Sequence, residues 1–132
     1  MSDPLEPCLA LIVEDDPGIR RLVEKILQRN GIEIDTACDG RVAIEKIRTG
    51  RYSVIILDLM LPEANGYEII EFIKRSGTLT PVAVVSAVSQ QALTKLDPDV
   101  VKLVISKPFD VSELSKAIVG LCGREGPAVA DG

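Results

Sequence analysis

LALIVEDD, residues 9–16, is the stretch that decides the fold of this chain. Its five apolar residues are followed at once by the carboxyl side chains of Glu14 and Asp15. An apolar run of this length, with β-branched residues in it, is typical of a strand buried on both faces of a parallel sheet. Acidic residues directly after such a strand would lie at the carboxyl edge of the sheet, where open α/β folds bind their ligands.

A second run of the same kind, VIIL at residues 54–57, is followed by Asp58. If the two strands are neighbours, the carboxylates of Glu14, Asp15 and Asp58 crowd one edge. At about 4 Å and an effective dielectric constant near 20, each pair of like charges repels by about 4 kcal/mol. The cluster therefore needs either a retained proton or a cation. Oxygen ligands favour a hard divalent ion, so we expect Mg²⁺, with Mn²⁺ as a substitute.

Apolar and amphipathic segments alternate along the chain, which predicts five strands and five helices. The expected strands are residues 8–13, 33–36, 53–57, 82–86 and 100–105. The expected helices follow residues 16–17, begin near 39–40, follow 65–66, lie around 89–96 and run from 111 to 121. This alternation favours an α/β fold with a doubly wound, five-stranded parallel sheet of order 2-1-3-4-5. We expect one domain over residues 8–122, between flexible segments 1–7 and 123–132.

The apolar spacing within the expected helices predicts which side chains face the core. We expect Leu22 to face inward in the first helix, with Val42 inward in the second and Tyr67 in the third. Asp16 is expected to cap the first helix, because a proline follows it at the first helical position.

The composition argues against several classes of function. The chain has 132 residues, of which 46% are hydrophobic and 27% charged, and its net charge is −5. Affinity for nucleic acid comes largely from Lys and Arg, so an acidic chain is not expected to bind it. No apolar stretch approaches the roughly 20 residues of a membrane span, and the first residues carry no secretory signal. We expect a cytoplasmic protein without a membrane role.

Cysteine and histidine content limits the chemistry further. The chain has three cysteines, Cys8, Cys38 and Cys122, without C-x-x-C spacing, and no histidine. A zinc site is therefore disfavoured, and we expect the cysteines to be reduced thiols packed as small apolar groups. Any phosphohistidine that takes part must belong to a partner.

Two more candidate residues stand at strand ends. Ser86 closes the expected strand 82–86, and Lys107 follows the last strand, just before Pro108. With strand order 2-1-3-4-5, strands 1, 3, 4 and 5 are neighbours around the switch point of the sheet. A carboxylate pair, a lone aspartate, a hydroxyl and an ammonium would then share one pocket.

Four segments together resemble the receiver domain of two-component response regulators. They are LIVEDD (11–16), VIILDLMLPEANGYE (54–68), PVAVVSA (81–87) and ISKPF (105–109), and the likeness covers residues 8–121. The resemblance implies a flavodoxin-like fold and a signalling domain, not an enzyme, that accepts a phosphoryl group on an aspartate. It implies that Asp58 is the phosphoacceptor and that the metal ligands are Glu14, Asp15, Asp58 and the main-chain carbonyl of Met60. It also implies that the phosphoryl group is contacted by Ser86, Ala87 and Lys107, and that the peptide bond before Pro108 is cis.

One position departs from the family pattern. Receivers often carry Tyr or Phe three residues before the lysine, and here that residue is Val104. Without a ring to turn inward, the usual coupling between hydroxyl and aromatic is altered. The fourth helix also looks short. We therefore expect signalling through the face around the fourth helix to be unusual, or to be carried mainly by the loop after Ser86.

The resemblance also implies partners. A sensor histidine kinase or a histidine phosphotransfer protein would dock over Pro17, Ile19 and Arg20 and over residues 108–109. The output would be contact with a downstream protein target or an output domain. Receivers can also pair through helix 4, strand 5 and helix 5, so a homodimer stays open.

Three alternatives remain at this point. A pseudo-receiver would act as an interaction domain independently of phosphorylation. An aspartate-nucleophile phosphatase would need a second acid two residues after Asp58, where the chain has Met60. A nucleotide- or flavin-binding module would need a glycine-rich loop after strand 1, where the chain has EDDPG.

Overall fold

The computed structural model describes residues 8–62 and 65–122, which form a five-stranded parallel sheet with helices on both faces. The strand order is β2-β1-β3-β4-β5, which confirms the predicted topology. The elements are β1 (Leu9–Val13), α1 (Pro17–Arg29), β2 (Glu33–Ala37), α2 (Gly40–Thr49), β3 (Val54–Leu57), α3 (Gly66–Ser76), β4 (Val82–Ser86), α4 (Gln90–Leu93), β5 (Val101–Ser106) and α5 (Val111–Cys122). The predicted flexible segments 1–7 and 123–132 lie outside the described residues.

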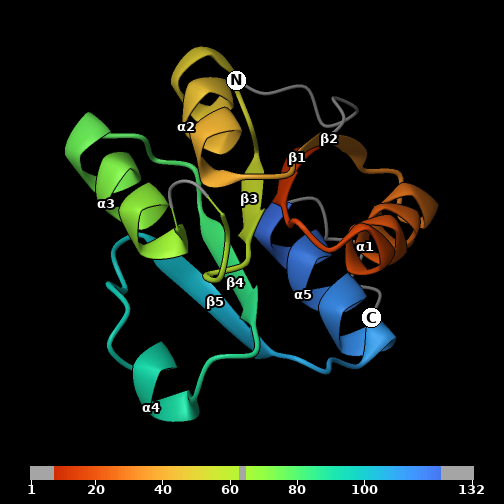
Figure 1. Ribbon diagram of the computed structural model, residues 1–132. Helices are drawn as coiled ribbons and strands as arrows, with labels where there is room; N and C mark the ends of the chain where they lie inside the picture. The colour runs from red at the N-terminus through yellow and green to blue at the C-terminus, as the bar shows by residue number, and fades with distance from the viewer. Residues whose placement is uncertain (1–7, 63–64, 123–132) are drawn as a thin grey trace.

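The sheet separates two hydrophobic cores. Side chains alternate between the faces of a strand, so Leu11 and Val13 of β1 point to one core and Ala10 and Ile12 to the other. The helices α2, α3 and α4 cover the first core, and α1 and α5 cover the second (Figure 1). Because both faces are covered, all residues of β3 and β4 are buried. The apolar runs seen in the sequence are therefore central strands.

Helix α1 begins as its sequence predicts. The Asp16 carboxylate accepts hydrogen bonds from the N–H groups of Gly18 and Ile19, and Pro17 occupies the first helical position. Helix α3 has a full capping box, in which Asn65 and Glu68 each accept the other's N–H. Helix α4 is a single turn, shorter than the predicted segment 89–96.

Three of the side chains expected to face inward do not. Leu22 is 42% exposed, Val42 37% and Tyr67 45%. Each lies beside the buried stripe of its helix and not within it, because consecutive residues of a helix differ by about 100° in direction. In α3, Ile69 and Ile70 fill the core side by side, which turns the Tyr67 side chain toward solvent.

The prediction that all three cysteines are reduced thiols is wrong for two of them. Cys8 and Cys122 form a disulfide, with their Cα atoms 5.8 Å apart. Cys8 precedes β1, and Cys122 ends α5, which packs over the core on that side of the sheet. Only the tertiary fold brings the two together. Cys38 is a free thiol, but it is exposed, so the expectation that it packs as a small apolar group is wrong.

None of the helices within residues 8–62 and 65–122 combines the length and the hydrophobicity that crossing a membrane requires.

Candidate functional site

Four strand ends meet at the carboxyl edge of the sheet. The backbone N–H of Asp58 donates to the carbonyl of Val13 at 3.1 Å, which sets the end of β3 beside the end of β1. The N–H of Lys107 donates to the carbonyl of Ser86 at 3.0 Å and joins the ends of β5 and β4 in the same way. The predicted site residues are therefore brought together by the sheet itself.

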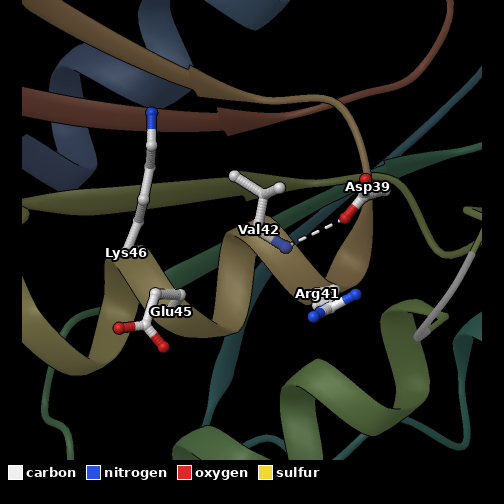
Figure 2. Close-up of a pocket in the computed structure, with 5 residues that line it drawn as sticks. All are labelled: Asp39, Arg41, Val42, Glu45 and Lys46. Atoms are coloured by element: carbon white, nitrogen blue, oxygen red, sulfur yellow. Dashed lines mark hydrogen bonds between the residues drawn. The ribbon is translucent and has the colours of Figure 1, made fainter.

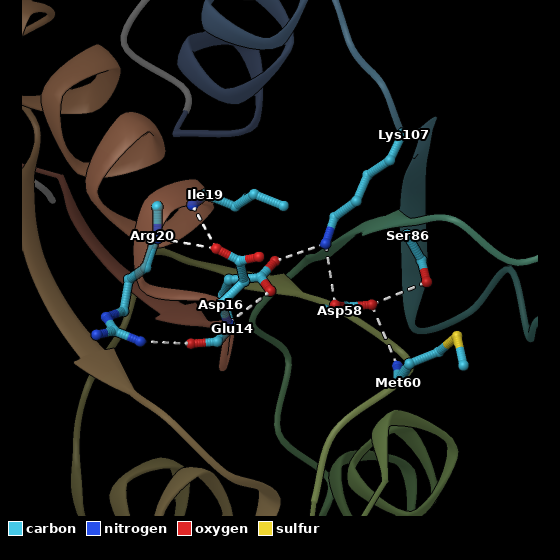
Figure 3. A network of polar contacts seen from close by, with 9 residues as sticks. Glu14, Asp16, Ile19, Arg20, Asp58, Met60, Ser86 and Lys107 are labelled. Atoms are coloured by element: carbon cyan, nitrogen blue, oxygen red, sulfur yellow. Dashed lines mark hydrogen bonds and ion pairs between the residues drawn. The ribbon is translucent and has the colours of Figure 1, made fainter.

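Asp58 is the centre of the side-chain network in Figure 3. Its Oδ1 accepts hydrogen bonds from Ser86 Oγ at 2.9 Å and from the Met60 N–H at 3.1 Å. Its Oδ2 pairs with Lys107 Nζ at 3.0 Å. Asp58 is 7% exposed and Ser86 is fully buried. The carboxylate is thus fixed in orientation, with both oxygens held by donors from three different segments of the chain.

Glu14 is held on the other side of the same lysine. Lys107 Nζ lies 2.8 Å from Glu14 Oε1, and the Asp16 N–H donates to Glu14 Oε2 at 3.2 Å. A guanidinium nitrogen of Arg20 donates to the main-chain carbonyl of Glu14 at 3.0 Å. Lys107 therefore bridges two buried carboxylates that are 44 positions apart in the chain.

Burial and charge shift two pKa values at the site. Burial raises the pKa of the Glu14 carboxyl, and the neighbouring Asp58 adds to this, while the hydrogen bond from Lys107 opposes it. Burial alone would lower the pKa of Lys107. Its hydrogen bonds to Glu14 and Asp58 outweigh burial and raise that pKa, so the lysine is a cation at neutral pH.

The carboxylates of Glu14, Asp15 and Asp58 form a cluster that fits a divalent cation. One oxygen from each lies within 4.8 Å of the others. Glu14 and Asp58 are buried and Asp15 is exposed, so the cluster opens to solvent on the Asp15 side. Three carboxylates against the single ammonium of Lys107 leave an excess of two negative charges. An all-oxygen donor set with that charge is what Mg²⁺ and Mn²⁺ prefer.

A hollow of about 570 Å³ lies beside Asp15. Its other lining residues come from the segment after β3, from the start of α3 and from Val88 after β4: Leu59, Met60, Leu61, Pro62, Asn65 and Tyr67. The Met60 side chain is 63% exposed at this opening. Asp15, the exposed member of the acidic cluster, therefore borders a hollow whose walls are mostly apolar.

The remaining predicted site residues lie around the network. Ala87 follows Ser86 and is exposed, and the peptide bond between Lys107 and Pro108 is cis. Val104 lies on β5 and is 38% exposed, outside the hydrogen-bonded network. Sequence reasoning missed the contact from Arg20 to Glu14, because it joins a helix to the preceding loop in a way that no residue spacing indicates.

A second hollow, of about 590 Å³, runs along α2 (Figure 2). It is lined by Asp39, Arg41, Val42, Glu45 and Lys46. Three of these side chains already have structural partners: Asp39 caps α2 at the N–H of Val42, Glu45 pairs with Arg48, and Lys46 pairs with Asp35 at 2.8 Å. This hollow contains none of the predicted site residues.

Comparison with known proteins identifies the family. Residues 10–119 match the family model of the response regulator receiver domain. The chain belongs to the receiver-domain family. Receiver domains are signalling domains of two-component systems, and the cluster of Glu14, Asp15 and Asp58 is the acidic metal-site cluster of such a domain.

Individual relatives agree with this assignment. The response regulator ArlR of Staphylococcus saprophyticus is 35% identical over 117 residues, which cover 87% of this chain and 52% of ArlR. The response regulator TrrA of Thermotoga maritima, solved in complex with Mg²⁺ and BeF, is 30% identical with a TM-score of 0.78, covering 86% of this chain and 98% of that one. A receiver domain of a Pseudomonas aeruginosa sensor histidine kinase, solved with a magnesium ion in its active-site cleft, is 25% identical with a TM-score of 0.79, covering 89% and 99%.

The receiver spans about half the length of the curated relatives that it matches, with 52% of ArlR and 47% of the transcriptional regulatory protein DltR of Streptococcus agalactiae covered.

Proposed function

We propose that this receiver accepts a phosphoryl group on Asp58 from the phosphohistidine of a sensor kinase or phosphotransfer protein, and that the phosphorylated form presents an altered protein-binding surface. The observation that carries the proposal is the network around Asp58. Its carboxylate is buried, bonded to Ser86 and Lys107, and within 4.8 Å of two further carboxylates that could share a metal ion.

Glu14, Asp15 and Asp58, with the main-chain carbonyl of Met60, would hold the Mg²⁺. The fit is supported by the all-oxygen donor set and by the excess of two negative charges at the cluster. When bound, the ion would neutralise the repulsion between these carboxylates and the oxygens of an incoming phosphoryl group.

The transfer itself needs no base from this chain. An oxygen of the Asp58 carboxylate attacks phosphorus, the P–N bond of the partner's phosphohistidine breaks, and its electron pair returns to the imidazole ring. A carboxylate is a nucleophile without deprotonation, which suits a chain that lacks histidine. Met60 and Ser86 donate to Oδ1 and hold the carboxylate still while the donor approaches.

Phosphorylation would rearrange the same contacts. Lys107 now pairs with Asp58 Oδ2 at 3.0 Å, and Ser86 Oγ bonds Oδ1 at 2.9 Å. Formation of the acyl phosphate removes the charge of the carboxylate and places a dianionic group beyond it, so both donors would move to phosphoryl oxygens, with the N–H of Ala87 as a third donor. The loop after β4 would follow Ser86, and this is the first step of the switch.

The route from Ser86 to the surface is proposed to differ from that of receivers with an aromatic residue at position 104. Val104 has no aromatic ring that could turn inward, and α4 is only one turn long. The segment 87–96 would carry most of the change. Binding of beryllofluoride with Mg²⁺ should therefore shift the amide NMR signals of residues 87–96, and unchanged signals there would contradict this route.

Incubation with Mg²⁺ and acetyl phosphate tests the proposal directly. We expect the protein to gain one phosphoryl group, seen by intact-mass spectrometry, and we expect Asp58→Asn to abolish the gain. Asp99→Asn, which changes an exposed aspartate outside the cluster, is the matched control and should be phosphorylated normally. EDTA should stop the reaction.

The outcome also separates the alternatives. No phosphorylation by acetyl phosphate or by any phosphohistidine donor would leave an interaction domain of the pseudo-receiver kind. Rapid, repeated hydrolysis of a generic phosphate ester would instead indicate a phosphatase. The side chain two residues after Asp58 is Met60, which cannot transfer a proton, so we expect the phosphorylated state to persist.

A further inference from the structure

We propose that Gly66 is a positioning residue for the acidic cluster, an inference that rests on the function proposed above. Gly66 is the first residue of α3 and is buried. A Cβ atom at this position would lie 2.5 Å from the Cα of Leu59 and 2.8 Å from the carbonyl oxygen of Asp58. The first turn of α3 can therefore rest directly on the backbone that carries the phosphoacceptor only because residue 66 has no side chain.

A hydrogen bond also joins the first turn of α3 to the loop after β3. The Gly66 N–H donates to the carbonyl of Leu59 at 3.0 Å, so helix and loop are joined as well as packed. Asn65 fixes the helix end from the other side through its capping box with Glu68. The segment from Asp58 to Met60 is thus held between β3, where it begins, and the first turn of α3.

A side chain at position 66 would have to move one of two anchored parts. Helix α3 is held by three buried isoleucines, Ile69, Ile70 and Ile73. Within residues 58–62, the loop has one fully buried apolar side chain, Leu59, and continues into Met60, which is exposed. The loop is the less anchored of the two, so it would give way, and the Asp58 carboxylate and the Met60 carbonyl would move with it.

Displacement of a few tenths of an ångström matters for a metal ligand. Mg²⁺ requires near-ideal octahedral geometry with oxygen ligands at about 2.0–2.1 Å. Changes in residues that orient metal ligands without touching the metal reduce metal affinity by about 10–100-fold. Gly66→Ala should therefore weaken Mg²⁺ binding at least about tenfold.

The chain supplies two matched controls. A Cβ at Gly50 would lie 2.6 Å from the Tyr52 ring and 2.8 Å from the carbonyl oxygen of Lys46, a comparable clash. Gly50 stands between α2 and β3, at the amino edge of the sheet, opposite the cluster. A Cβ at Gly120 in α5 would meet nothing within 4 Å. Gly50→Ala should lower the melting temperature and leave Mg²⁺ affinity unchanged. Gly120→Ala should lower neither the melting temperature nor the Mg²⁺ affinity.

The experiment measures Mg²⁺ affinity by isothermal titration calorimetry, and melting temperature by circular dichroism, for the full chain and the three variants. The rate of phosphorylation by acetyl phosphate is then followed against Mg²⁺ concentration. For Gly66→Ala we expect the half-saturating Mg²⁺ concentration to rise at least about tenfold. The phosphorylation rate at saturating Mg²⁺ should change by a smaller factor than the half-saturating concentration. A variant that is only less stable would not lose Mg²⁺ affinity while keeping most of its rate at saturating Mg²⁺.

Wild-type Mg²⁺ affinity in Gly66→Ala would overturn the inference, and so would an equal loss in Gly50→Ala. In both cases the proposed function stands if the unmodified chain binds Mg²⁺ and accepts a phosphoryl group. Should Gly66→Ala not fold, Asn65→Ala releases the capping box without adding a clash. Weakened Mg²⁺ binding in that variant supports the inference, and unchanged binding overturns it.

Discussion

Removal of the disulfide between Cys8 and Cys122 should strongly destabilise the domain. The bond joins residues 114 positions apart and so closes almost the whole folded chain into one loop. In the chain-entropy model, a cross-link over about 100 residues stabilises the native state by about 4.7 kcal/mol, and removal of native disulfides typically costs about 2–5 kcal/mol. We expect Cys122→Ser to lower the free energy of unfolding by an amount in that range.

Cys122 is the better of the two positions to change. Cys8 is 3% exposed, so a serine there would add the cost of a buried hydroxyl to the loss of the bond. Cys122 is half-buried at the end of α5, where a hydroxyl can reach water. Urea unfolding without reductant, followed by circular dichroism, gives the free energy of unfolding for each protein.

Cys38→Ser is the matched control, because Cys38 is exposed and outside the bond. It should unfold at the same urea concentration as the unmodified chain. Reductant should bring the unmodified chain to the stability of Cys122→Ser and should leave that variant unchanged. If Cys122→Ser and the oxidised unmodified chain unfold at the same urea concentration, the reasoning from loop closure is wrong for this protein.

Three further outcomes are expected. Lys107→Ala leaves Glu14 and Asp58 buried without their shared cation and should lower the free energy of unfolding by about 3 kcal/mol. Added Mg²⁺ should reduce this loss, and thermal melts with and without Mg²⁺ check both expectations. Mg²⁺ at 100 times its dissociation constant should stabilise the unmodified chain by about 2.7 kcal/mol, and calorimetry should show that gain reduced in Asp15→Asn. Burial and the hydrogen bond to Asp35 raise the pKa of Tyr52 to about 12 from 10.0, so the stability that this group adds is complete below pH 10 and is lost as the pH rises toward 12. Thermal melts against pH should show that Tyr52→Phe removes that part of the pH dependence. In a separate Tyr67→Phe variant, where Tyr52 is the one remaining tyrosine, ultraviolet absorbance against pH reports the pKa of Tyr52 directly.

Much of the fold could be predicted because its signals are local. The central strands are short apolar runs between residues with clear boundary preferences, and for β4 the predicted and observed bounds, 82–86, are identical. The alternation of strands and helices predicted a parallel doubly wound sheet, and the order 2-1-3-4-5 is one of the two common orders of such sheets. The candidate site followed from topology, since parallel strands place their carboxyl ends at one edge.

The errors concern features that depend on long-range contacts. The orientation of Tyr67 depends on how α3 is rotated against the sheet, which residue spacing defines only to within about one position. The disulfide depends on where the two ends of the domain meet. The bridge from Lys107 to both Glu14 and Asp58 joins residues 93 and 49 positions apart, and sequence reasoning could place these groups at one edge without assigning their pairs.

The closeness of Cys8 and Cys122 has a consequence for protein architecture. With Cα atoms 5.8 Å apart, the first and the last residues that the structure describes lie at nearly one point. The segment 8–122 could therefore be inserted into a surface loop of a host protein without forcing that loop apart, and joining residues 8 and 122 directly while opening the chain elsewhere would give a circular permutant.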